Sequence, residues 1–241
     1  MEAIRGTLLF KFLREMAQAI KEGAAEGSEE ADREIAIEKE AKAAEQRARV
    51  RVLERRLAAT PTAERLLSAI AAPYREVFMG ELGAAKDEGR PPVYLFCAGL
   101  PDGEVESWKS LLNRDFDIED GDDAAAFVDA FVATIGEGKA TKPEAAVWLV
   151  RAAHVATGAV GAGYVEPGRA ADWAAALVPI AAGHFTGWSD LGVAFLEGER
   201  SAPGSNMLGR KFLARAVNRL NEDARSPWAK LDWPAAADAL R

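Results

Sequence analysis

Apolar side chains recur at helical spacing from residue 141 to residue 198, the most strongly patterned part of the chain. Thr141 to Glu144 (TKPE) is a capping-box sequence, because the threonine hydroxyl can accept a hydrogen bond from the backbone N–H of Glu144, whose carboxylate reaches back. The helix that follows is apolar on more than a narrow stripe, so we expect it to be buried on much of its surface. Gly161 and Gly163 should end this helix, and Glu166-Pro167 should open the next.

The first 59 residues have a different pattern. Residues 4 to 20 predict an amphipathic helix, and residues 29 to 59 a long charged helix that is acidic first and basic last, which suits the helix macrodipole. Large apolar residues become frequent only after Thr60-Pro61. The pattern therefore predicts an all-α fold, with a compact helical bundle over residues 60–241 and a long N-terminal helical arm over residues 1–59. We expect the arm to be dispensable for folding of the bundle and to serve self-association or partner binding.

Two stretches of the bundle depart from simple helical periodicity. Thr60 and Pro61 should cap and start a helix that runs to about Lys86, and Pro73 should bend or split that helix near Ala72. Residues 91 to 97 (PPVYLFC) are the only strand-like run, which we interpret as buried extended chain or the start of a helix. Cys97 lies in this run, where we expect a small buried thiol and no reactive nucleophile.

An acidic segment, residues 115 to 123, suggests a divalent-cation site. A calcium loop that started at Asp115 would place Asp120 where glycine is required and Ala126 where the bidentate glutamate is required, so the loop fails twice. We expect instead a turn in which Asp122 caps a helix from Asp123 to Ile135.

Two kinds of side chain offer further chemistry. His154 and His184 lie on neighbouring predicted helices, where they either are structural or bind a metal together with a carboxylate such as Glu166 or Asp190. Arg151 lies on an otherwise apolar helix, and a buried guanidinium must be paired or must face a cavity. We expect it to form a salt bridge to an acid such as Asp172 or Asp190, with the binding of an anionic ligand as the alternative.

Several motifs of this chain together resemble a known family. The residues that carry the resemblance are Trp148, Arg151, Gly158, Gly163-Tyr164, the run from Gly187 to Gly192 (GWSDLG), Phe195-Leu196, Gly198, Ser226-Pro227-Trp228 and Trp233. They resemble the bacterial domain of unknown function 1266 over roughly residues 104–233. Phe116-Asp117-Ile118 is similar to a Trp-Gly-Ile turn of that family, and Gly187 replaces its usual serine. The resemblance implies a helical intracellular bacterial domain and no established activity.

Composition narrows the functional classes. The net charge is −8, and residues 1 to 60 hold twelve basic and twelve acidic groups, so the acidic excess lies in the bundle. An acidic body disfavours nucleic acid as a partner, because phosphate binding needs a basic face. One cysteine excludes an internal disulfide, and the sequence shows neither a signal peptide nor a membrane span, so we expect a cytoplasmic protein.

These observations favour a non-enzymatic interaction domain, such as an immunity, adaptor or chaperone-like protein, with a protein partner; the acidic surface favours a basic one. One alternative is a metal-dependent or hydrolytic enzyme that uses Arg151, His154 and His184 with nearby carboxylates. Another is a structural assembly protein organised by the arm. We assign no catalytic residue, metal or cofactor; the residues we select for ligand or partner binding are Arg151, His154, Tyr164, His184, Trp188 and Asp190.

Overall fold

The computed structural model describes residues 33–45, 47–48, 51, 55, 58–81, 105–136, 138, 140–202, 206–224 and 226–234. Every regular element in these ranges is an α-helix, which confirms the all-α prediction. None of the helices in them is long and apolar enough to cross a membrane. The amphipathic segment 4–20, the run 91–97 and Cys97 lie outside the described residues.

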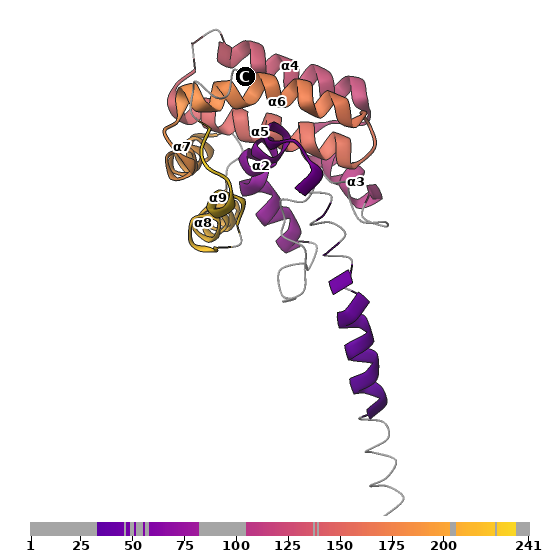
Figure 1. The fold of residues 1–241 in the computed structure, drawn as a ribbon. Coiled ribbons are helices and arrows are strands. Elements are labelled where there is room, and N and C mark those ends of the chain that lie inside the picture. Colours follow the sequence, from indigo (N-terminus) through magenta and orange to yellow (C-terminus); the bar gives the residue numbers. More distant parts are fainter. Residues whose placement is uncertain are drawn as a thin grey trace, which may run out of the picture. The chain divides into compact units, whose positions relative to one another are not determined.

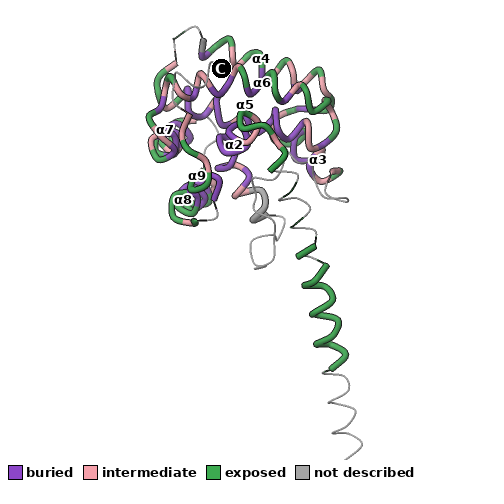
Figure 2. Tube along the Cα trace, in the orientation of Figure 1, coloured by how far each residue is buried: buried purple, intermediate pink, exposed green. Residues whose placement is uncertain are grey.

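The chain divides into two units, Met1–Arg49 and Val50–Arg241. In the first unit, residues 33–45 are helical and exposed (Figure 2), as expected for part of the charged helix. The second unit contains the remaining helices, and all contacts described below lie within it. The proposed arm boundary at residue 59 and the dispensability of the arm stay predictions.

Helix α5, Lys142–Gly161, is the centre of the second unit (Figure 1). Its capping box is formed as predicted: the Thr141 hydroxyl accepts from the Glu144 N–H, and the Glu144 carboxylate accepts from the Thr141 N–H at 2.9 Å. Nearly every position from Ala145 to Ala159 is buried, because α2, α3, α4, α6 and α7 all pack against this helix. Small alanine side chains allow this close approach of helices from several sides.

The other helices surround α5. They are α2 (Thr62–Glu81), α3 (Val105–Phe116), α4 (Gly121–Gly136), α6 (Pro167–His184), α7 (Trp188–Ser201), α8 (Met207–Glu222) and α9 (Pro227–Lys230). In Figure 1, α4 and α6 lie along one side of α5, whereas α7, α8 and α9 gather at another. Trp173 and Trp188 are buried in the core, and Trp148 packs against the same core while half-buried.

Helix α2 begins at Thr62, one residue after the predicted first helical residue Pro61, and is continuous through Pro73, so of the two predicted effects of this proline, a bend or a split, the split is wrong. A proline has no N–H, and Pro73 therefore leaves the carbonyl of Ala69, four residues earlier, without its helical partner. The indole N–H of Trp228 donates to this carbonyl at 2.8 Å. A side chain from α9 thus replaces the missing hydrogen bond inside the core.

In the turn between α3 and α4, a second prediction, that Asp122 caps the following helix, is wrong. Helix α4 starts at Gly121, and its first N–H groups are capped by Asp120 and not by Asp122. One Asp120 carboxylate oxygen accepts from the N–H groups of Asp122 at 2.9 Å and Asp123 at 3.0 Å. Asp117, at the position of the glycine in the Trp-Gly-Ile turn, has φ of +55°, a left-handed conformation that favours glycine.

Candidate functional site

Three helices contribute to a polar cluster of Tyr74 from α2, Arg151 from α5 and Glu199 from α7. Arg151 Nε donates to the Tyr74 hydroxyl oxygen at 3.0 Å, and Arg151 Nη2 lies 2.9 Å from Glu199 Oε1. The Tyr74 hydroxyl donates to the same Glu199 oxygen. The Arg151 side chain is 33% exposed and that of Glu199 is 10% exposed. Burial is the largest cause that raises the pKa of Tyr74 well above its ordinary value, so the phenol remains a neutral donor.

Arg151 therefore forms a salt bridge, as expected, but the acid is Glu199 and not Asp172 or Asp190. Asp172 lies 3.8 Å from Arg169, and Asp190 pairs with Lys142. The hydrogen bonds of the cluster join α2, α5 and α7 and leave each of its three side chains with partners. The arrangement is suited to holding these helices together.

His154 is fully buried beside this cluster, within a group of aromatic rings. Its ring centroid lies 5.7 Å from that of Tyr74 and 5.4 Å from those of Trp108 and Phe116. Burial, with a smaller contribution from the nearby Arg75 guanidinium, holds the pKa of His154 well below its ordinary value. The imidazole is therefore neutral at pH 7 and packs as a ring.

Arg75 is fully buried next to the same region. Its guanidinium donates to the Ser68 hydroxyl at 3.4 Å and to the Thr157 hydroxyl. Sequence reasoning missed Arg75, because an arginine beside Tyr74 in the sequence gives no sign of being buried. Only the packing of α2 in the fold decides that this side chain is covered.

His184 ends α6 and has different neighbours from His154. Its ring centroid lies 6.1 Å from that of Phe185. Among the described residues, no ring contact joins the two histidines, and no group of three or more histidine, cysteine or acidic side chains is arranged to hold a metal ion. The sequence left open that the two histidines meet. Among the described residues, no ring contact joins them.

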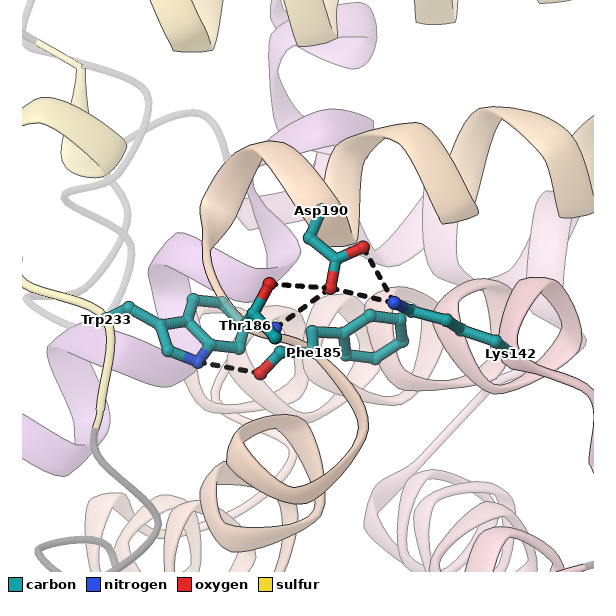
Figure 3. Close-up of polar contacts among 5 residues, drawn as sticks. All are labelled: Lys142, Phe185, Thr186, Asp190 and Trp233. Atoms are coloured by element: carbon teal, nitrogen blue, oxygen red, sulfur yellow. Dashed lines mark hydrogen bonds and ion pairs between the residues drawn. The ribbon is translucent and has the colours of Figure 1, made fainter.

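Asp190, at the start of α7, joins the beginning of α5 to the turn between α6 and α7 (Figure 3). Its two carboxylate oxygens lie 2.7 and 2.8 Å from Lys142 Nζ. One of them also accepts from the Thr186 N–H at 2.9 Å and the Thr186 hydroxyl at 3.1 Å. The hydrogen bond from Lys142 is the largest cause that lowers the pKa of Asp190.

A tryptophan clasp, which we define as Trp188, Trp228 and Trp233, lies against the same turn. The Trp188 and Trp228 rings are stacked with centroids 5.8 Å apart, and Trp233 meets Trp188 edge-on at 4.6 Å. The indole N–H groups of Trp188 and Trp233 donate to the carbonyls of Leu231 at 2.7 Å and Phe185 at 3.1 Å, the second of which Figure 3 shows. These bonds hold the segment after α9 against the α6–α7 turn.

The Ser-Pro-Trp element positions this clasp through local geometry. Ser226 caps α9 by accepting from the Ala229 N–H, Pro227 occupies the first helical turn, and Trp228 then projects into the core.

Tyr164, another residue selected from sequence, is half-buried after α5, and its ring lies 5.9 Å from Lys109 Nζ.

Sequence reasoning also missed the outer face of α8. Leu213, Ala216, Val217 and Leu220 are buried, with the i, i+3, i+4, i+7 spacing of one helical face. Leu208, Lys211, Phe212 and Arg215 repeat the same spacing on the opposite side and are exposed. We call these four residues the outer face of α8. Leu208 is 63% and Phe212 46% exposed, and Met207 beside them is 67% exposed.

The two sets of spacings in α8 were a usable signal, because a helix with apolar residues on both sides needs packing partners on both sides to bury them.

Comparisons with curated proteins and with solved structures found no match. A comparison with family models matched residues 8–233, most of the chain, to one family, described as a protein of unknown function (DUF1266). The match contains the cluster of Tyr74, Arg151 and Glu199, the tryptophan clasp and the outer face of α8, and the chain thus belongs to the DUF1266 family.

Proposed function

We propose that this protein is a protein-interaction domain without catalytic activity, and that it binds its partner through the outer face of α8. The observation that carries the proposal is the exposure of Met207, Leu208 and Phe212 next to one another on a single helix. Large apolar side chains that gather on a surface, rimmed by polar groups, mark interaction sites more often than scattered ones do. An adaptor, immunity or chaperone-like role would each use such a surface.

The interior polar groups support this proposal over an enzyme. An enzymatic site built on Arg151 and His154 needs groups that can engage a substrate and transfer protons near neutral pH. Arg151 is already bonded to Tyr74 and Glu199, and the pKa of His154 is held far below neutrality. These side chains are better suited to stabilise the packing of α2, α5 and α7.

Site-specific photo-cross-linking tests the proposal. A photoreactive amino acid is placed at Leu208 or Phe212 of the full-length chain, and at Ala126, an exposed position of α4, as the matched control. Cells that produce each variant are irradiated, and adducts are resolved by mass. We expect discrete protein adducts from the two α8 positions and none from position 126. Absence of α8 adducts, or the same adducts from all three positions, would refute the proposal.

A further inference from the structure

Helix α8 is strongly basic in an acidic chain. It contains Arg210, Lys211, Arg215 and Arg219 against one acidic residue, Glu222, whereas the whole chain has a net charge of −8. Arg219 lies 3.1 Å from Glu76 of α2 and is thereby used within the fold. Arg210, Lys211 and Arg215 are exposed and form no ion pair with any residue that the structure describes. Three cations are therefore left facing solvent along one helix.

The positions of these cations do not help α8 to fold. Lys211 and Arg215 are four residues apart, and like charges at this spacing destabilise a helix. Arg210 and Lys211 also lie near the N-terminal end of α8, where the helix dipole favours anions, and the first turn holds no acidic residue. An anionic group bound at this surface would remove both penalties.

We propose, on the basis of the interaction function above, that the outer face of α8 binds an acidic amphipathic helix of a partner protein, and not the basic partner that the net acidic charge of the chain suggested. Leu208 and Phe212 lie one turn apart and would receive apolar side chains of that helix, and Lys211 and Arg215, also one turn apart, would pair with its carboxylates. The apolar contacts at the centre supply affinity, and the charges at the rim select an acidic partner and accelerate association.

Two other polyanions fit this surface less well. A membrane-bound amphipathic helix inserts its continuous apolar face into the lipid, but in α8 that face, with Leu213, Val217 and Leu220, is buried in the body. Nucleic acid needs several cations along a phosphate backbone. Here two of the four outer-face residues are large and apolar, and the remainder of the chain is acidic.

Fluorescence anisotropy with a labelled model peptide tests the proposal on the full-length protein. The probe is an amphipathic helical peptide of about 18 residues, with leucine on one face and glutamate elsewhere; the matched peptide has lysine in place of every glutamate. We expect saturable binding of the glutamate peptide, which weakens as salt is raised from about 50 to about 300 mM. The lysine peptide should bind about tenfold more weakly or not at all.

Variants identify the surface. The double variant Lys211→Glu, Arg215→Glu and the single variant Phe212→Ser should each weaken binding of the glutamate peptide by about tenfold or more. The control variant Ile35→Ser, Ile37→Ser removes two exposed apolar side chains from the first unit and should leave binding unchanged. Circular dichroism melts of all variants should match the wild type, since every altered side chain is exposed.

Several outcomes would overturn the proposal. Equal binding of both peptides would show apolar docking without selection for acid, and discrete cross-links from α8 would then still uphold the interaction function. Sedimentation with vesicles of phosphatidylcholine and phosphatidylglycerol that is lost in the Lys211→Glu, Arg215→Glu variant would assign this face to a membrane. Light scattering that gives the mass of a dimer for the wild type and of a monomer for Phe212→Ser would assign the outer face of α8 to a second copy of the chain. Tight peptide binding in a chain that lacks residues 1–59, against none in the full chain, would assign it to the chain's own arm.

Discussion

The hydrogen bond from Trp228 to the carbonyl of Ala69 should stabilise the fold only because residue 73 is proline. The test perturbation is Trp228→Phe, which removes the indole N–H and retains an aromatic ring in the core. With Pro73 in place, α2 lacks the N–H four residues on that would ordinarily bond to the Ala69 carbonyl, and Ala69 is fully buried. The second perturbation is Pro73→Ala, which returns the N–H that α2 lacks.

The expected size follows from the burial of the carbonyl. A buried backbone acceptor left without a partner costs about 1–3 kcal/mol, and the smaller ring of phenylalanine adds a packing loss of about 1 kcal/mol. We therefore expect Trp228→Phe to lower the free energy of unfolding by about 2–4 kcal/mol in the natural background. In the Pro73→Ala background the new N–H of residue 73 satisfies the carbonyl, so only the packing loss should remain.

Urea unfolding followed by circular dichroism measures both differences in a double-mutant cycle. The coupling energy between positions 73 and 228 should be about 1–3 kcal/mol, with the slope of the free energy against urea unchanged. Trp233→Phe is the matched control, because its indole N–H donates to the Phe185 carbonyl and not to α2. Trp233→Phe and Pro73→Ala should be additive.

A coupling energy below about 0.5 kcal/mol would refute the reasoning, since independent sites add to within that margin. The cost of Trp228→Phe would then be one of ring packing alone. The continuity of α2 through Pro73 would in that case need another source of stability.

Three further predictions follow from single positions. Asp117→Gly should raise the free energy of unfolding by about 0.5–1 kcal/mol, because φ is +55° there; an unchanged or lower thermal midpoint would contradict this. Gly198→Ala should lose about 1–3 kcal/mol, because its Cβ would lie 2.3 Å from the Pro143 carbonyl oxygen, whereas Gly183→Ala, with nothing within 4 Å, should lose nothing in the same urea titration. The free energy of unfolding should fall as the pH drops below about 6.5, because His154 is then protonated in the unfolded chain but not in the folded one, where burial lowers its pKa. His154→Phe should remove this pH dependence from urea midpoints measured between about pH 7.5 and about pH 5.5. The control His184→Gln should retain the dependence.

Features that depend on a few neighbouring residues could be predicted from the sequence. The capping box at Thr141, the proline start of α6 and the near-complete burial of α5 all appeared as expected, because capping, proline geometry and apolar density act within one or two turns. The all-α class followed from the same local signals. Even here the cap of α4 was placed two residues late, since Asp120 and Asp122 are chemically equivalent candidates.

Contacts between distant parts of the chain could not be predicted in this way. Arg151 required a partner, but the choice of Glu199 depends on how α7 packs across α5. The Ala69 carbonyl, which loses its usual helical partner at Pro73, accepts from an indole N–H of α9, and no local rule supplies that partner.

The outer face of α8 shows most directly what only the tertiary structure decided. Its sequence carries two sets of residues with the same helical spacing, one purely apolar and one that contains two cations. Packing against α2 and α7 buries the purely apolar set, since burying Lys211 and Arg215 would remove their charges from water without partners. The sequence thus determined that α8 has two faces, and the assembled helices determined that Leu208, Phe212 and their neighbouring cations are left exposed.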